Sequence, residues 1–190
     1  MNTPSRARTL AFVGMPGAGK TLCAKYLEAQ GFFQFRFGGI IVDEVHRRGL
    51  ALTPEHERLV REEFRANEGM DAIAKRALPH LRHALQSHHS LIIDGLYSFS
   101  EYKTLRRELG DDMILVAIVA ERGLRYARLA QRPERPLSAQ EAEARDVREI
   151  EFIEKGGPIA MADYTLLNNG TSEALLSQLD DLLQRLNFHV

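Results

Sequence analysis

The sequence predicts an α/β domain in which helices cover both faces of a mostly parallel, five-stranded sheet. Short apolar runs alternate with amphipathic stretches along the chain, and this alternation indicates strands joined by helical crossovers. The apolar runs are continuous, as from Met113 to Val119, which is typical of parallel strands buried on both faces. We therefore expect a three-layer α/β/α fold.

The composition is that of an ordinary globular protein. Of the 190 residues, 44% are hydrophobic and 27% are charged, and the length suits one domain over residues 1–190. The formal net charge of −1 gives no general attraction to nucleic acid or membranes, and no apolar run approaches the roughly 20 residues of a membrane span. The lone cysteine, Cys23, leaves no partner for an internal disulfide and suits a reducing cytosol, so we expect a cytoplasmic monomer or small homo-oligomer.

Local signals place the individual elements. Gly31 ends the first helix, and Gly38-Gly39 is expected to turn the chain from the second strand into the next helix. Thr53-Pro54 combines an N-cap with a first-turn proline, and Ser138 to Glu141 has the spacing of a capping box, so each opens a helix. We expect strands at residues 9–13, 32–37, 90–94, 113–119 and 163–168. Helices are expected at 19–29, 40–48, 53–67, about 70–81, 100–109 and 123–131, from 138, and over 175–186.

The second expected strand, residues 32–37, carries four phenylalanines. Base stacking is one use of such a row of aromatics. Side chains alternate between the two faces of a strand, however, so we expect these rings to lie mainly in the core.

The stretch Gly14-Met15-Pro16-Gly17-Ala18-Gly19-Lys20-Thr21 fits the pattern G-x-x-x-x-G-K-[ST] between a strand and a helix. Its glycines allow the backbone to curve so that successive N–H groups point into one concavity, and the helix that follows adds the positive end of its dipole. This arrangement favours a polyphosphate and predicts the P-loop NTPase fold. We expect bound ATP to contact Gly14, Pro16, Gly17, Ala18, Gly19, Lys20, Thr21 and Leu22.

Three residues are expected to take part in catalysis and metal binding. Lys20 can reach the β- and γ-phosphate oxygens of the nucleotide, and the Thr21 hydroxyl can bind Mg²⁺. Asp94 ends an apolar strand, where its carboxylate can hold the same Mg²⁺ directly or through water. The alternative is that Asp94-Gly95 is only a turn signal.

Residues 121–148 contain seven arginines and no lysine, with prolines in the middle of the segment. The forked guanidinium group matches the charge of a transferring phosphoryl group. We predict that residues of about 128–148 form a lid over ATP and that Arg128, Arg132 and Arg135 contact phosphate. A solvated helix face with i,i+4 ion pairs is the alternative.

These motifs, with Arg47-Arg48-Gly49-Leu50, Arg61-Glu62-Glu63-Phe64 and Ala162-Asp163-Tyr164, occur in the order seen in small P-loop kinases. The chain resembles the adenylate kinase and dephospho-CoA kinase group, and in particular a dephospho-CoA kinase-like family. The resemblance implies a helical acceptor-binding segment at about 39–88 and a lid. It also implies that Asn168 and Asn169 lie near the adenine.

The chain departs from this group on the acceptor side. Where the group usually carries an aspartate and two arginines, this sequence has Gly39, Val42 and Tyr97. Asp43, one helical turn after Gly39, and Arg61 are the acceptor contacts we expect in their place, together with Gly95 at the strand end. An exposed acid at Asp43 and a surface ion pair of Arg61 with Glu57 or Glu62 are equally open.

The sequence thus predicts an ATP- and Mg²⁺-dependent phosphotransferase acting on a small molecule, a nucleotide or a nucleotide-like compound. Its partners are ATP, ADP and that acceptor, with no nucleic acid and no membrane. Two alternatives stay open: a P-loop ATPase or nucleotide-dependent switch with no small-molecule acceptor, and a non-catalytic protein that binds adenine nucleotides.

Overall fold

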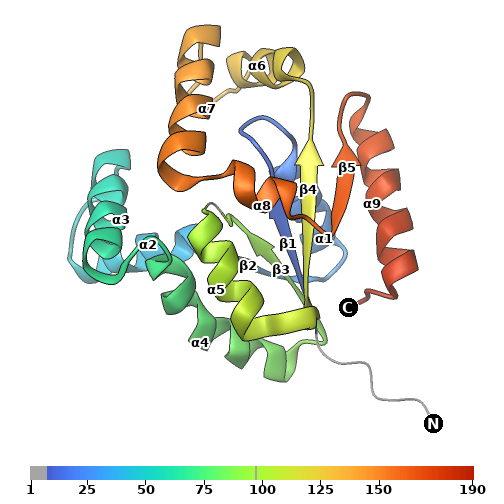
Figure 1. Cartoon of the computed structure of the whole chain (residues 1–190), viewed down its shortest axis with the longest axis horizontal. Helices are drawn as coiled ribbons and strands as arrows, with labels where there is room; N and C mark the ends of the chain where they lie inside the picture. The colour runs from blue at the N-terminus through green and yellow to red at the C-terminus, as the bar shows by residue number, and fades with distance from the viewer. Residues whose placement is uncertain (1–7, 97) are drawn as a thin grey trace.

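The computed structural model describes residues 8–96 and 98–190. Its centre is a five-stranded parallel sheet with the strand order β2-β3-β1-β4-β5 (Figure 1). The strands are β1 (Arg8–Val13), β2 (Phe33–Arg36), β3 (Ser90–Asp94), β4 (Met113–Val119) and β5 (Tyr164–Leu167). Because all five run in one direction, their carboxyl ends meet at one edge of the sheet, and ligands of such sheets bind at that edge.

The helices cover both faces, which confirms the predicted three-layer fold. They are α1 (Lys20–Ala29), α2 (Phe37–Arg47), α3 (Pro54–Glu68), α4 (Ala72–Ser87), α5 (Phe99–Leu109), α6 (Arg122–Ala130), α7 (Ala139–Ile153), α8 (Gly156–Ala160) and α9 (Ser172–Leu186), with a short 3₁₀ turn, η1 (Gly110–Asp112). Alternation along β1 divides the core: Leu10 and Phe12 face α1 and α9, while Ala11 and Val13 face α2 to α5. The central strand is therefore buried on both sides.

Capping fixes where several helices begin. Thr53 accepts a hydrogen bond from the His56 N–H at the start of α3, and Ser138 forms the predicted capping box at the start of α7. A second capping box, Ser98 with Glu101, opens α5 and is buried. The sequence shows the same Ser-x-x-Glu spacing there, so this helix start was open to prediction as well.

One expectation about the second strand and the helix after it is wrong. Gly38 and Gly39 do not form a turn but lie inside the first turn of α2, which begins at Phe37. Phe37, which is 1% exposed, anchors that turn in the core. The expectation that the phenylalanines lie mainly in the core is confirmed. Phe32 and Phe37 are buried and Phe35 packs against the core, whereas Phe33 is 36% exposed because β2 is an edge strand.

The helix α8 and the extent of α4 were not predicted from sequence. Two glycines and a proline are poor helix formers, yet Pro158 is buried and α8 packs against α5. The helix α4 continues through Pro79 to Ser87. Across residues 8–96 and 98–190, no helix is both long enough and apolar enough to cross a membrane.

Candidate functional site

The loop between β1 and α1 lies at the carboxyl edge of the sheet and is held in a conformation that requires glycine. Gly17 has φ 79° and Gly19 has φ 113°, which is the left-handed region that side chains disfavour. A Cβ atom at Gly17 would also lie 2.7 Å from the Arg125 carbonyl oxygen, and one at Gly19 would lie 2.4 Å from Asn168 Nδ2. Other residues would therefore strain the loop and displace its neighbours.

Four main-chain N–H groups of this loop have no protein partner among the described residues. Ala18 N–H donates to the Met15 carbonyl at 3.1 Å, and the hydrogen bonds of α1 begin with Leu22 N–H donating to Gly19 at 3.0 Å. In the part of the chain that the structure describes, the N–H groups of Gly17, Gly19, Lys20 and Thr21 donate to no protein acceptor. Four free amides at the positive end of a ten-residue helix form a site for an anion.

Lys20 crosses this loop and brings positive charge to it. Its Nζ donates to the Gly14 carbonyl at 2.7 Å and to the Met15 carbonyl at 3.2 Å. Burial, together with the nearby charge of Lys155, lowers the pKa of Lys20 to about 7. The charged form of Lys20 is therefore less favourable here than that of an exposed lysine.

Asp94, at the end of β3, lies close enough to Lys20 for the two charges to interact. Burial raises the pKa of the Asp94 carboxyl group, and the charge of Lys20 opposes that effect. Gln34 Nε2 donates to Asp94 Oδ2 at 3.3 Å. The Thr21 side chain is exposed beside the loop. Together, the Thr21 hydroxyl and the Asp94 carboxylate give the hard oxygen donors that Mg²⁺ prefers.

A buried arginine that the sequence did not single out joins the lid segment to the loop. Arg125 on α6 is 6% exposed and forms two hydrogen bonds with Asp146 on α7, at 3.1 and 2.6 Å. Its Nη1 also donates to the Pro16 carbonyl at 3.0 Å. This buried pair fixes α6 and α7 above the carboxyl edge of the sheet, next to the loop (Figure 1).

The three arginines predicted to contact phosphate lie in different surroundings. Arg128 Nη2 donates to the Asn168 carbonyl at 2.9 Å, while its Nη1 is buried with no hydrogen-bond partner among the described residues. Partial burial and the charge of Arg145 lower the pKa of Arg132, which places Arg132 beside that residue. Arg135 is exposed, with φ 52°, and makes no ion pair within the described ranges. Phosphate contact stays a prediction for all three.

Glu149 on α7 forms ion pairs with two further cations, whose charges act on Lys20. Arg145 Nε donates to Glu149 Oε1 at 3.0 Å, and Lys155, just after α7, forms an ion pair with the same carboxylate. No local pattern marks this group in the sequence, because Lys155 stands in a turn and Glu149 resembles any other acid on a charged helix.

Asn168 and Asn169 support the loop and the start of α6. Asn168 is 5% exposed, and its Nδ2 donates to the Ala18 carbonyl at 2.8 Å. Asn169 Oδ1 accepts from the Glu121 N–H at 2.9 Å. Both side chains are therefore engaged with protein, and their predicted place near an adenine stays a prediction.

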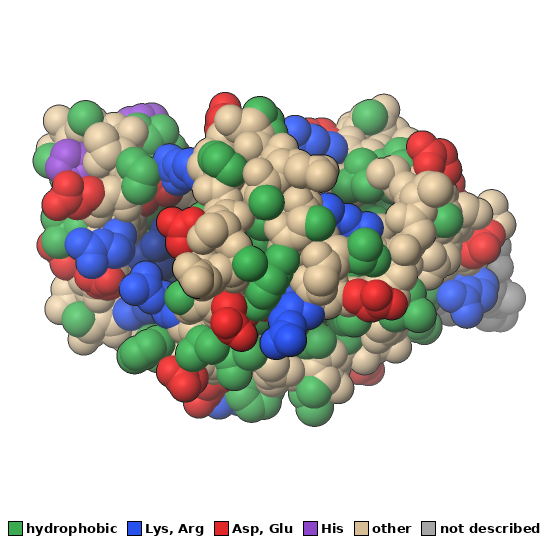
Figure 2. Space-filling model, turned by 90° about the horizontal axis from the view of Figure 1, so that it is seen from above, with side chains coloured by type: hydrophobic (Ala, Val, Ile, Leu, Met, Phe, Trp, Pro, Cys, Tyr) green, Lys and Arg blue, Asp and Glu red, His purple; other side chains and the backbone are tan. Residues whose placement is uncertain are grey.

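The charged residues expected to contact the acceptor lie on α2 and α3. Arg61 on α3 is half-buried and, within the described part of the chain, forms no ion pair with Glu57 or Glu62; Glu62 pairs with Arg58 at 3.8 Å. Asp43 is exposed on α2, and Gly95 follows β3 with φ 96°. Tyr97 lies outside the described residues. Figure 2, viewed from above, shows Lys and Arg side chains interspersed with Asp and Glu on the lobe at its left, formed by α2 and α3, and beside the hollow next to it.

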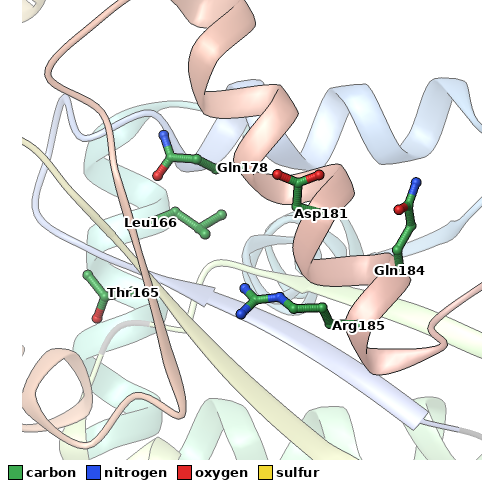
Figure 3. Close-up of a pocket in the computed structure, with 6 residues that line it drawn as sticks. All are labelled: Thr165, Leu166, Gln178, Asp181, Gln184 and Arg185. Atoms are coloured by element: carbon green, nitrogen blue, oxygen red, sulfur yellow. The ribbon is translucent and has the colours of Figure 1, made fainter.

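Another hollow lies between β5 and α9 (Figure 3). It has a volume of about 460 Å³, and none of its lining residues belongs to the loop, α6 or α7. The Gln178 side chain there hydrogen-bonds both the N–H and the carbonyl of Leu167, at 3.1 and 2.9 Å, and so covers part of the sheet edge. We therefore assign the site from the loop geometry and not from the size of a hollow.

Comparison with known proteins gives the family. Residues 10–151 match the family described as AAA domain. A UPF0200 protein from Thermococcus kodakarensis is 35% identical over 176 residues, which cover 91% of this chain and 95% of that relative. The chain belongs to the AAA domain and UPF0200 families. It is also 34% identical to a UPF0200/UPF0201 protein from Archaeoglobus fulgidus, but it spans only 56% of that relative's length.

Solved structures share the fold of this UPF0200 chain. TT1252 from Thermus thermophilus has a TM-score of 0.65 at 18% identity, covering 95% of this chain and 98% of that one. Shikimate kinase from Acinetobacter baumannii has a TM-score of 0.56 at 17% identity, covering 96% and 95%. A gluconokinase from Sinorhizobium meliloti 1021 has a TM-score of 0.54 at 15% identity, covering 96% and 97%. These likenesses confirm the predicted P-loop kinase fold, whereas the narrower resemblance to dephospho-CoA kinase and adenylate kinase stays a prediction.

The buried pair of Arg125 and Asp146 gives a test of how the lid segment is held. We expect Asp146→Ala to lower the free energy of unfolding by about 3–5 kcal/mol, because it leaves a guanidinium buried without its counter-charge. Glu143→Ala is the matched control: Glu143 lies on the same helix, in an exposed pair with Arg122 at 3.8 Å, and should cost less than about 1 kcal/mol. Urea unfolding measures both, and equal losses would contradict the assignment.

Proposed function

We propose that this chain is an ATP- and Mg²⁺-dependent phosphotransferase whose acceptor is a small molecule, a nucleotide or a nucleotide-like compound of the kind that a dephospho-CoA kinase uses. The observation that carries the proposal is the set of four unpaired N–H groups between Gly17 and Thr21, with Lys20 beside them. Such a group of donors matches the oxygens of a triphosphate tail.

Each residue of the loop has a distinct part in this proposal. The amides hold the phosphates in place, and Lys20 leaves the Gly14 and Met15 carbonyls to meet the β- and γ-phosphate oxygens. Thr21 and Asp94 are the residues that would hold Mg²⁺, which when bound neutralises charge on the transferring group. Catalysis then consists mainly of positioning and charge neutralisation.

The acceptor is proposed to lie between the lid and the α2–α3 lobe, where Asp43 and Arg61 are its expected contacts. Arg61 supports this placement because, among the described residues, it forms no ion pair with Glu57 or Glu62. Kinases of shikimate and gluconate share the fold, which shows that the architecture hosts phosphoryl transfer to small molecules. The assignment of a nucleotide-like acceptor comes from the sequence resemblance.

The acceptor side also favours a second candidate, an ATPase or nucleotide-dependent switch. A Cβ atom added at Gly39 would meet nothing within 4 Å, so the place where related kinases carry an acidic side chain is open space. Val42 adds no charge there. A non-catalytic adenine-nucleotide-binding protein is the third candidate.

One assay separates these candidates: ADP release from ATP with Mg²⁺, measured alone and with a panel of nucleotides, nucleosides and dephospho-CoA. We expect release that depends on one class of acceptor, and at least a 100-fold fall in turnover for Lys20→Ala, with the fold intact by circular dichroism. Lys25→Ala, an exposed lysine on the same helix, is the control and should keep the wild-type rate. Release without any acceptor would favour the ATPase, binding without release would favour the non-catalytic protein, and near-full activity of Lys20→Ala would refute the role of Lys20.

The lowered pKa of Lys20 predicts proton uptake on nucleotide binding. At pH 8 Lys20 is mostly neutral in the empty loop, because its pKa there is about 7. A bound polyphosphate favours the charged form and raises this pKa, so binding at pH 8 should take up close to one proton, and affinity should fall as the pH rises above 7. Calorimetry in buffers of different ionisation enthalpy measures the uptake. Lys25→Met should retain it and Lys20→Met should lose it; equal uptake in both variants would contradict the assignment to Lys20.

A further inference from the structure

Asp94, one of the two residues proposed to hold Mg²⁺, ends β3 on the face of the sheet that α1 covers. Two residues earlier on the same strand, Ile92 belongs to the same buried cluster as Leu27 of α1. Because side chains alternate along a strand, Asp94 points to that face as well. In the register of β1 and β3, Ala11 lies opposite Ile93, so the two strands end side by side. Asp94 therefore lies next to the start of the loop between β1 and α1.

Gln34, on the neighbouring strand β2, donates a hydrogen bond to this carboxylate. In the register of the two strands Gln34 lies opposite Ile92, so its side chain shares a face of the sheet with Asp94. Gln34 Nε2 lies 3.3 Å from Asp94 Oδ2. Among the described residues, the other oxygen of Asp94, Oδ1, accepts no hydrogen bond from the protein. One oxygen of the carboxylate is thus held by the protein, while the other is left for a ligand.

A second contact fixes which end of the Gln34 amide faces Asp94. Arg36 Nη2 donates to Gln34 Oε1 at 3.3 Å, and a guanidinium group has donors but no acceptor. An ionised carboxylate, in contrast, has acceptors but no donor. Both neighbours of the amide therefore require the same orientation, in which Gln34 presents its N–H to Asp94.

Helix α1 holds Arg36 in turn. Arg36 Nη2 also donates to Glu28 Oε2, at 3.2 Å. The contacts thus run from Glu28 through Arg36 and Gln34 to the carboxylate of the metal site, and they join α1, β2 and β3. The helix that carries the Thr21 hydroxyl at its first turn therefore also supports the orientation of Asp94 through its last turn.

A hydrogen bond to one oxygen limits the rotation of a carboxylate, which otherwise turns about two bonds of the aspartate side chain. Partners of this kind orient the groups that bind metal ions, and their loss weakens metal binding. The amide of Gln34 is neutral. It can therefore orient the carboxylate without adding a positive charge that would repel Mg²⁺.

We propose that Gln34 is a positioning residue that orients the Asp94 carboxylate for Mg²⁺, and that Arg36 fixes the Gln34 amide for this task. The inference rests on the proposed function and gives the edge strand β2 a part in its metal site. Gln34 acts through Asp94 and contacts neither the metal nor the nucleotide.

The test compares ATP affinity in Mg²⁺ with ATP affinity in EDTA, measured by calorimetry, and needs no knowledge of the acceptor. The ratio of the two dissociation constants is the gain in affinity from the metal. Gln34→Met should lower this gain about 10-fold and leave the affinity in EDTA within about twofold, because the loop amides are unchanged. Arg36→Met should lower the gain less, since the amide is still present. Gln86→Met, at an exposed glutamine on α4, is the control and should change neither affinity.

A second comparison tests whether Gln34 acts through Asp94. In protein that already carries Asp94→Ala, Gln34→Met should cause no further fall in the gain, because the two residues form one unit. A further fall would overturn the proposal, and so would a full gain in Gln34→Met alone or an equal loss of affinity with and without Mg²⁺.

If circular dichroism shows that Gln34→Met is unfolded, Arg36→Met decides, and an unchanged gain in that variant would overturn the proposal. Failure of the proposed function gives different results. Wild-type protein whose ATP affinity does not depend on Mg²⁺ would refute the proposed metal site, and wild-type protein that binds no ATP would refute the proposed function itself.

Discussion

The structure depends on one constraint: four main-chain N–H groups after β1 must stay free of protein acceptors. Helix α1 cannot satisfy them, because the first amides of any helix lack a partner one turn back. The surroundings keep the loop open by binding its other atoms. The Asn168 side chain donates a hydrogen bond to the Ala18 carbonyl, and Arg125 donates one to the Pro16 carbonyl. The Ile118 carbonyl leaves no room for a side chain at Gly14. The last two strands, β4 and β5, and the lid segment therefore support a site that lies directly after the first strand, β1.

The same constraint explains the charges around the loop. Free amides attract an anion, and Lys20 lies beside them. The protein holds the Lys20 side chain against the Gly14 and Met15 carbonyl oxygens in the empty state. A polyphosphate would bind the charged form of this side chain more strongly, because a carbonyl oxygen carries no net charge. The arrangement is thus stable when empty but suited to exchange its partners for phosphate oxygens.

Sequence reasoning reached the fold and the loop because both are coded locally. The motif from Gly14 to Thr21, the continuous apolar strands and the capping box at Ser138 are each read from neighbouring residues. The supports of the site are coded by contacts between distant residues, so the sequence did not reveal them. Nothing local distinguishes Arg125, which is buried against Asp146, from the exposed Arg122. The start of α2 was misjudged for the same reason, since burial of Phe37 outweighs the poor helix propensity of the glycines after it.

The central claim is that the amides after β1 bind a polyphosphate, and amide NMR tests it most directly. Titration of the ¹⁵N-labelled chain with ATP and Mg²⁺ follows each N–H group separately. The resonances of Gly17, Gly19, Lys20 and Thr21 should undergo the largest shifts, while that of Gln178, at the hollow between β5 and α9, should stay in place. Large shifts confined to the β5–α9 hollow, or no shift at the four loop amides at saturating ATP, would contradict the account.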